Sequence, residues 1–467
     1  MTPQKPVLLI PVENQVRELD AKLLLACVAA RQELASIIGP KRAIESRIAS
    51  YPRSIFLSKS LRIGKRKFFP IARQLGHEIV AWDEEALVHL PPETYFTRRL
   101  SPVGMEHVSH LFAWGEDNAE LWRQYSKLPA GIPIHVTGNP RSDLLRPDMR
   151  VFYEKDAEEI RNAYGNFILI NTNFNHVNAF YPAQNLFQPV EKFDEEARFG
   201  QAARGMTREY AEGLRAHKQT IFIDFLRLIP DLEKSFPEYT IVVRPHPTEN
   251  HEAYREIAAG CQRVRVTNAG NVVPWLMATK ALLHNGCTTG VEAYVMRVPA
   301  VSYRPTVNDD YDDGFYQLPN RLSYQCFNYE ELRETLERIL SGEQGAAAGD
   351  ERKALSDRHL AAQDGPLACE RIVEVLTKIA GDLTRLSEPA LRDRLEGRLK
   401  ATRRRIRQSY KAYLPGSFKS LAFQRHRYPA IALGEVADRL SKFQQILGHD
   451  RALQLDEISN KLFRIST

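Results

Sequence analysis

Two polar segments, each directly after an apolar strand, carry side chains suited to holding an anion. Residues 241–247 read Ile-Val-Val-Arg-Pro-His-Pro, so a β-branched run delivers Arg244 and His246 to its carboxyl end. About forty residues later, residues 283–292 read Leu-His-Asn-Gly-Cys-Thr-Thr-Gly-Val-Glu, a strand end followed by a helix start. Parallel sheets bind ligands at the carboxyl ends of their strands, so a guanidinium and an imidazole there suit a phosphate or a nucleotide.

The second segment places backbone N–H groups and hydroxyls at a helix N-terminus, where the helix dipole helps them to hold an anion. A third polar turn, at residues 171–173, follows the apolar strand 167–171. The candidate binding residues are therefore Arg244, His246, Pro247, Asn285, Gly286, Thr288, Thr289, Glu292, Asn171 and Asn173. The competing interpretation is a stiffened strand exit and an ordinary helix cap, and the occurrence of both motifs at strand ends favours binding.

Four carboxylates follow strands in the first third of the chain. Glu13 and Asp20 come after the apolar strand 7–12, and Asp83 and Glu84 come after the strand 78–82. A general base or nucleophile would come from such strand ends. The alternative is that these acids only complement helix starts or form salt bridges.

Strands and helices alternate along most of the chain, which predicts an α/β protein with doubly wound parallel sheets. At 467 residues the chain is too long for one typical core. We expect two Rossmann-like lobes facing a cleft, at residues 1–147 and 148–380, and a basic helical extension at 381–467.

The net charge of +6 is concentrated near the end of the chain, since residues 391–428 hold twelve Lys or Arg and two Asp or Glu. This stretch suits an anionic membrane surface better than nucleic acid, because no nucleic-acid motif accompanies it; the alternative is a solvated helical face packed on the lobes. The first apolar strand is too short for a signal sequence or a membrane span, and five scattered cysteines suggest neither disulfides nor a zinc site. We therefore expect a cytoplasmic protein that could rest on the inner face of the cytoplasmic membrane.

Six motifs together resemble the bacterial surface carbohydrate biosynthesis protein family, over roughly residues 6 to 380. They lie at residues 11–13, 17–20, 82–85, 137–141, 244–247 and 284–292. More distantly, the chain is similar to GT-B transferases that use cytidine nucleotides, including CMP-Kdo transferases. In those enzymes a His-Pro pair and a Ser/Thr-rich helix start bind the nucleotide and its phosphate, positions held here by His246-Pro247 and Thr288-Thr289.

The resemblance implies a GT-B glycosyltransferase that moves a CMP-activated 2-ulosonic acid, of the Kdo or nonulosonic acid type, to a surface polysaccharide or lipopolysaccharide acceptor. The first lobe would take the glycan or glycolipid acceptor and the second the CMP-sugar donor, without a metal or cofactor. Asp83 or Glu84 ranks first as the catalytic carboxylate, then Glu13 or Asp20. The alternatives are a nucleotide-sugar epimerase of the UDP-GlcNAc 2-epimerase type, whose members share the motif at 137–140, and a noncatalytic nucleotide-sugar-binding partner of a polysaccharide assembly complex.

Overall fold

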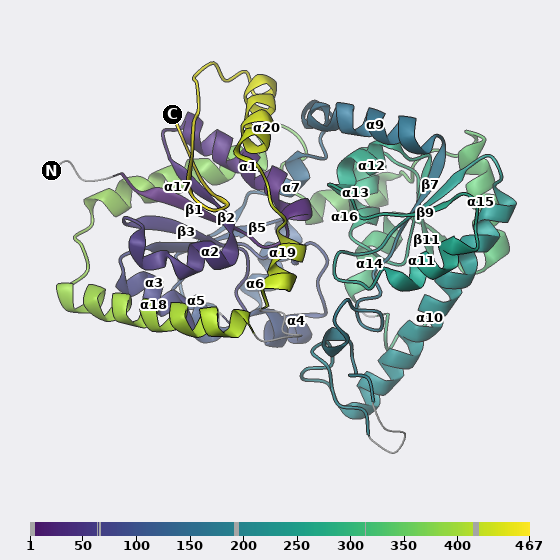
Figure 1. Ribbon diagram of the computed structural model, residues 1–467, viewed down its shortest axis with the longest axis horizontal. Helices are drawn as coiled ribbons and strands as arrows, with labels where there is room; N and C mark the ends of the chain where they lie inside the picture. The colour runs from purple at the N-terminus through teal and green to yellow at the C-terminus, as the bar shows by residue number, and fades with distance from the viewer. Residues whose placement is uncertain (1–4, 63, 65–66, 191–195, 313, 414–419) are drawn as a thin grey trace. The chain divides into compact units, whose positions relative to one another are not determined.

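The computed structural model describes residues 5–62, 64, 67–190, 196–312, 314–413 and 420–467 (Figure 1). The chain forms two compact α/β units, one of Met1–Phe152 with Asp357–Thr467 and one of Tyr153–Ser356. Each unit holds one sheet of mainly parallel strands with helices packed against it. The expected fold class, two Rossmann-like lobes with a helical C-terminal extension, is confirmed.

The first sheet has the strand order β13-β14-β2-β1-β3-β4-β5-β6. Strands β1 to β6 are parallel, and β2 and β3 lie on opposite sides of β1. The chain therefore reverses direction at β1, which creates a switch point between β1 and β3 where loops diverge and ligands can bind. The strands are β1 (Val7–Val12), β2 (Ser36–Pro40), β3 (Ser54–Ser58), β4 (Glu78–Ala81), β5 (His110–Ala113), β6 (Ile134–Val136), β13 (Gln454–Ser459) and β14 (Leu462–Ser466).

The second sheet has the order β12-β11-β10-β7-β8-β9 and is parallel throughout. The chain starts at β7, moves through β8 to β9, then crosses back to β10 on the other side of β7. Its switch point lies between β7 and β10. The strands are β7 (Phe167–Asn171), β8 (Thr240–Arg244), β9 (Val264–Val266), β10 (Ala281–His284), β11 (Ala300–Tyr303) and β12 (Tyr324–Cys326).

Helices cover the sheets because parallel strands buried on both faces need apolar partners on each side. Strands β1 and β7, at the two switch points, are buried along their whole length. The first unit contains α1 (Gln15–Arg31), α2 (Lys41–Ser46), α3 (Phe69–Gln74), α4 (Pro92–Arg99), α5 (Pro102–Met105), α6 (Glu116–Arg123), α7 (Pro140–Asp143), α8 (Pro147–Arg150), α17 (Ala368–Arg385), α18 (Leu391–Ala412), α19 (Leu421–Arg427) and α20 (Leu433–Ile446). The remaining helices are α9 (Glu154–Tyr164), α10 (Arg208–Ser235), α11 (Glu252–Ala259), α12 (Val272–Ala278), α13 (Thr289–Met296), α14 (Gly314–Arg321), α15 (Tyr329–Leu340) and α16 (Asp350–His359).

The domain boundaries differ from those expected at 147 and 380, because the chain returns to the first unit at Asp357. Helix α17 packs on α1, and the Asp143 carboxylate accepts hydrogen bonds from the backbone N–H groups of Ala368 (2.7 Å) and Cys369 (2.9 Å) at its start. This carboxylate satisfies two of the N–H groups that a helix N-terminus leaves without partners. Residues 357–380 therefore belong to the first lobe.

The C-terminal extension is also part of the first lobe and is not wholly helical. Its last residues form the antiparallel hairpin β13–β14, and β14 pairs with β2, so the hairpin widens the first sheet. Leu462, Phe463 and Ile465 on β14 are fully buried, while α18 packs on α2 and α3 and α20 packs on α1. The expected separate tail of residues 381–467 is replaced by an extension that completes the core.

Replacing Phe463 with Ala tests this integration. Its side chain is 1% exposed, so Phe463→Ala should lower the free energy of unfolding by about 3–5 kcal/mol, as for other buried phenylalanines. The matched control is Ile458→Ala on β13, where the side chain is 44% exposed and a change within about 0.5 kcal/mol is expected. Urea denaturation of the full chain measures both, and equal small effects would mean that the hairpin does not support the sheet.

Candidate functional site

Strand pairing in the second lobe gathers the three polar segments at one sheet edge. Asn171 ends β7 and pairs in register with Arg244 on β8 and His284 on β10. The turn after β7, the Pro-His-Pro segment and the start of α13 therefore leave the sheet side by side, around the switch point. The register of three neighbouring strands thus brings the three candidate segments to one sheet edge.

Two amide oxygens near this edge are buried without a hydrogen-bond partner among the described residues. They are Oδ1 of Asn171, whose residue is 4% exposed, and Oδ1 of Asn285. An unsatisfied buried acceptor costs about 1–3 kcal/mol, so a ligand that donates O–H or N–H groups would recover this free energy. Sugar hydroxyls and the amino group of a nucleotide base are donors of this kind. Asn173 is half-buried beside them.

His246 is oriented by its own loop. The backbone N–H of Thr248 donates to Nδ1 (3.3 Å), so the neutral imidazole carries its proton on Nε2, where it can donate. The adjoining backbone is held by Glu249, which is fully buried and accepts hydrogen bonds from the His246 N–H (3.1 Å) and the Tyr254 hydroxyl (2.6 Å). Burial raises the pKa of Glu249, against the lowering effect of these hydrogen bonds.

Glu249 also accepts a 3.0 Å hydrogen bond from the Thr172 hydroxyl, so it ties the turn after β7 to the Pro-His-Pro segment. The sequence analysis did not select Glu249. A carboxylate three residues after a histidine gives no signal of burial, because that depends on Tyr254 and Thr172 arriving from other elements.

Arg244 has a different role from the expected phosphate contact. Its guanidinium is buried, lies 4.7 Å over the Trp275 ring, and donates to the backbone carbonyls of Ala269 (2.7 Å) and Gly270 (3.2 Å). Burial lowers its pKa to about 9. In this structure Arg244 therefore holds the loop after β9.

The start of α13 is built around a neutral histidine. Nδ1 of His284 accepts from the Gly286 N–H (3.0 Å), and burial lowers the pKa of His284 to about 3. Gly286 has a φ of 83°, and a Cβ on Gly290 would lie 2.5 Å from the imidazole, so glycine is required at both positions. The Thr289 hydroxyl donates to Sγ of Cys287 (3.2 Å), which fits a packing role for that thiol.

Thr288 is the half-buried N-cap of α13, and its side chain makes no capping hydrogen bond. Glu292 is buried one turn into the helix, and Pro247 is half-buried beside His246. The three predicted segments therefore present Asn171, Asn285, His246 and Thr288 near one another, whereas Arg244 and Thr289 are engaged within the fold.

A small hollow at the same sheet edge adds residues that the sequence analysis missed. Its lining includes Asn285, Lys218 from α10 and Arg304 after β11. Asp312 also lines it and lies 2.9 Å from Nε2 of His217, 3.6 Å from Nζ of Lys218 and 3.5 Å from the Arg304 guanidinium. Burial would raise the pKa of Asp312, but the hydrogen bond from His217 and the neighbouring charges lower it to about 2.

The switch point of the first lobe contains a network of buried charges. Glu18 is 3% exposed and forms ion pairs with Lys22 (2.7 Å) and Lys59, while Glu13 lies 3.1 Å from Nζ of Lys59. Lys22 also lies 3.2 Å from Glu84. The backbone N–H of Glu13 donates to Glu18 (3.0 Å), so this carboxylate both neutralises the lysines and holds the end of β1.

The four predicted catalytic carboxylates differ in exposure. Asp83 is fully buried, forms an ion pair with Arg99 and accepts a hydrogen bond from the Tyr95 hydroxyl (3.0 Å). Glu84 is 4% exposed and accepts from the Trp82 indole (3.0 Å), and Asp20 is 5% exposed and paired with Arg439.

Glu13 is the partly exposed member, since 27% of its side chain is accessible and it lines a pocket. Burial would raise its pKa, yet Lys59, Lys41 and Arg427 hold the pKa well below its usual range. Glu13 is therefore ionised and within reach of a ligand.

Glu18 gives a pH-dependent test of the first-lobe network. Burial would raise its pKa, but Lys22 and Lys59 outweigh this effect and lower it to about 2. A depressed carboxylate pKa contributes stability above the unfolded-state pKa, and this contribution is lost as the pH falls. Glu18→Gln should therefore lower the free energy of unfolding by about 3 kcal/mol at pH 7, and its deficit against the wild type should shrink between about pH 4.5 and pH 2.

The control is Glu33→Gln, at an exposed ion pair with Lys5, which should leave stability at pH 7 nearly unchanged. Thermal denaturation across the pH series measures all three proteins. A deficit that stays constant with pH would contradict the assigned ion pairs.

Among the described residues, no helix is long and apolar enough to cross a membrane. Within the same part of the chain, no group of three His, Cys, Asp or Glu side chains is arranged to hold a metal ion.

No protein-family model matches the chain, and no curated protein matches it in sequence. Among solved structures, the Methanocaldococcus jannaschii UDP-GlcNAc 2-epimerase in complex with UDP-GlcNAc and UDP is similar at 13% identity, over 80% of this chain and 100% of that chain, with a TM-score of 0.45. The wall teichoic acid polymerase TagF is similar at 10% identity, over 82% of this chain and 91% of that chain, with a TM-score of 0.48. A putative UDP-N-acetylglucosamine 2-epimerase from Listeria monocytogenes is similar at 15% identity, over 83% and 99% of the two chains, with a TM-score of 0.44. At these levels of similarity the two-lobed architecture rests on the strand order described above, and the chemistry rests on the residues at the two switch points.

Proposed function

We propose that the protein is a glycosyltransferase that binds a nucleotide-activated sugar at the carboxyl edge of its second sheet. The observation that supports this most is the switch point between β7 and β10, flanked by the unsatisfied oxygens of Asn171 and Asn285 and by His246. The specific proposal is a CMP-activated 2-ulosonic acid, of the Kdo or nonulosonic acid type, as donor. The acceptor is a surface polysaccharide or lipopolysaccharide.

The chemistry of such a donor explains the residue types. Loss of CMP develops negative charge on the phosphate and oxocarbenium character at the anomeric carbon, so transfer needs donors near the first and a carboxylate near the second. Nε2–H of His246, the Thr288 hydroxyl and the N-terminal N–H groups of α13 are such donors. The oxygens of Asn171 and Asn285 would accept from hydroxyl or amino groups of the donor.

The activating carboxylate is proposed to come from the first lobe, and Glu13 leads the candidates. Its partial exposure and its place in a pocket favour it over Asp83, Glu84 and Asp20, which are almost completely buried. It would activate the acceptor hydroxyl if the anomer inverts, or attack the donor if the anomer is retained through a covalent adduct.

Nucleotide binding tests the donor assignment. The protein should bind CMP in preference to UMP and UDP, and His246→Ala should weaken binding about tenfold, because a hydrogen bond to a charged phosphate contributes about 1.5 kcal/mol or more. The double variant Thr288→Ala/Thr289→Ala should weaken it similarly, whereas Thr220→Ala, at an exposed position on α10, should not. Calorimetry with equal affinity for UDP, or an unchanged affinity of the His246 variant, would overturn the assignment.

Steady-state transfer tests the carboxylate. Glu13→Gln should reduce transfer by roughly 10² to 10⁴-fold if Glu13 is a general base, with CMP binding unchanged. Glu33→Gln serves as the control for charge removal. Near-normal transfer by folded Glu13→Gln would shift the role to another first-lobe acid.

The same assays separate the alternatives. Interconversion of UDP-sugars without an acceptor would indicate an epimerase. CMP binding without CMP release, when donor and acceptor are both present, would indicate a noncatalytic binding partner.

A further inference from the structure

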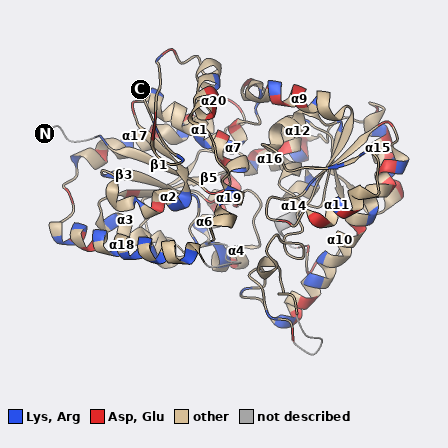
Figure 2. Ribbon diagram, in the orientation of Figure 1, with Lys and Arg blue, Asp and Glu red and all other residues tan. Residues whose placement is uncertain are grey.

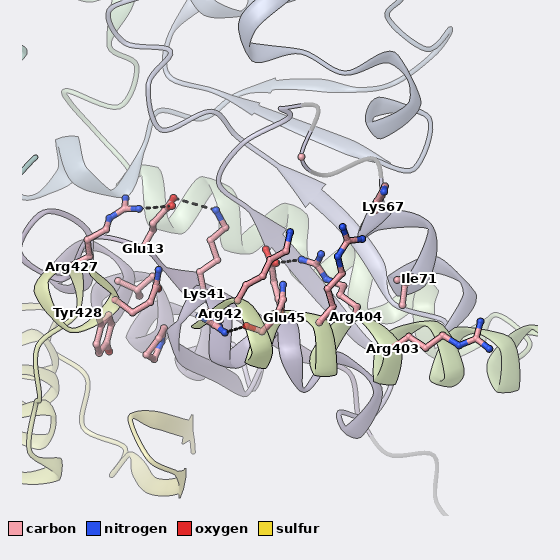
Figure 3. A pocket seen from close by; sticks show the side chains of 17 residues that line it. Glu13, Lys41, Arg42, Glu45, Lys67, Ile71, Arg403, Arg404, Arg427 and Tyr428 are labelled. Atoms are coloured by element: carbon pink, nitrogen blue, oxygen red, sulfur yellow. Dashed lines mark hydrogen bonds and ion pairs between the residues drawn. The ribbon is translucent and has the colours of Figure 1, made fainter. Parts of the chain in front are cut away.

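The C-terminal extension forms one wall of a pocket in the first lobe (Figure 3). Helices α18 and α19 lie across the ends of β1 and β2 and the start of α2, and the cavity between them has a volume of about 570 Å³. This is the size of a typical small-ligand site, which is about 300–1,000 Å³. The pocket is distinct from the second-lobe edge proposed to bind the donor.

The pocket has a large excess of positive charge. Its lining includes eight cationic side chains and two carboxylates, namely Lys41, Arg42, Lys67, Arg403, Arg404, Arg407, Lys411 and Arg427 against Glu13 and Glu45. Lys and Arg recur along the whole of α18 (Figure 2), but only some of them line the cavity. So many like charges around one cavity repel one another unless an anion lies between them.

The two carboxylates are already neutralised. Glu13 lies 2.8 Å from the Arg427 guanidinium and 3.3 Å from Nζ of Lys41, and Figure 3 shows these two cations on either side of it. Glu45 pairs with Arg404 at 2.6 Å. Of the remaining cations, Lys67, Arg403, Arg407 and Lys411 form no ion pair with any carboxylate that the structure describes.

Buried donor atoms in the lining also lack partners. The Tyr428 hydroxyl makes no hydrogen bond within the described chain, although the residue is only 4% exposed. Nε of Arg404 and Nε of Arg427 are buried and unsatisfied in the same way. The two Nε–H groups can only donate and the Tyr428 hydroxyl can donate, so one acceptor would satisfy all three, and an anionic oxygen does so best.

The composition of the pocket favours phosphate over other anions and over nucleic acid. Arginine forks match phosphate oxygens in pairs, and arginine supplies five of the eight cations. Tyr428 is the one aromatic residue among the described residues that line the pocket, so these residues give no stacking surface for successive bases. Val12, Pro40 and Ile71 add apolar surface that could contact the carbon skeleton of a ligand.

We propose that this pocket is a binding site for a ligand that carries two or more phosphoryl groups, from either a soluble phosphoester or an anionic lipid headgroup. The cations come from α2, α18, α19 and Lys67, so they surround the cavity and can engage separate phosphoryl groups. The proposal does not depend on the donor assignment, because the donor site is built from second-lobe residues and takes another ligand; Glu13 is the residue that lines this pocket and also serves in the proposed transfer.

Two double variants on one helix test the site. Arg403→Gln/Arg407→Gln removes two pocket cations, and Arg398→Gln/Arg405→Gln removes two exposed cations of α18 that do not line the cavity. Both change the net charge equally, so an unspecific electrostatic effect must be the same in the two proteins. We expect the pocket variant to bind inorganic pyrophosphate at least tenfold more weakly by calorimetry, and the control variant to bind it within about twofold of the wild type.

Tyr428→Phe removes only the unsatisfied hydroxyl and should weaken pyrophosphate binding severalfold without lowering thermal stability. The two phosphate sources are separated with vesicles of phosphatidylcholine that contain cardiolipin, a lipid whose headgroup carries two phosphoryl groups. Vesicle binding that pyrophosphate displaces, and that only the pocket variant loses, would assign the site to a lipid headgroup; pyrophosphate binding without vesicle binding would assign it to a soluble phosphoester.

Three results would overturn the proposal. They are no binding of pyrophosphate or vesicles by the wild type, equal losses in the two double variants, and RNA binding that pyrophosphate does not displace. CMP binding measured on the same variants should be unchanged, so failure of this site and failure of the donor assignment are distinguishable.

Discussion

The first lobe depends on the burial of Glu18 between two lysines. A carboxylate that is 3% exposed is stable only if it is neutralised, and Lys22 and Lys59 arrive from the next turn of α1 and from the end of β3. The same carboxylate accepts hydrogen bonds from the backbone N–H groups of Glu13 (3.0 Å) and Asn14 (3.2 Å). The exit of β1, the start of α1 and the exit of β3 are therefore fixed by one group, at the point where the chain reverses direction.

The corresponding point of the second lobe is stabilised differently. Its nearby histidine, His284, is neutral, and Asn171 and Asn285 supply amide oxygens in place of charges. An unsatisfied neutral acceptor costs much less than an unpaired charge, so this edge can stay open for a ligand while the first-lobe edge must be neutralised internally. This contrast agrees with a proposed donor site built on the second sheet.

Sequence patterns predicted strands such as β8, because β-branched runs such as 241–243 have few alternatives to a buried strand, but they did not predict β2, β12, β13 or β14. The sequence did not show which lobe the later helices and strands would join. Helix α17 has an apolar face that would suit either lobe, and its place is decided by the Asp143 carboxylate about 225 residues earlier. The roles of charged residues were also difficult to predict, because the burial of Lys59, Glu249 and Arg244 depends on partners from other elements.

The C-terminal extension supplies arginines that pair with carboxylates of the first lobe. Arg427 pairs with Glu13 across 414 positions of sequence, and Arg439 pairs with Asp20 across 419. Two of the four candidate carboxylates thus receive a counter-ion from the extension, and Arg427 also lines the basic pocket. A phosphoryl group that engaged Arg427 would compete with Glu13 for the same guanidinium. Loss of that partner would leave Glu13 with Lys41 and Lys59 alone and raise its pKa toward the ordinary range, which is the direction that makes a carboxylate a better general base.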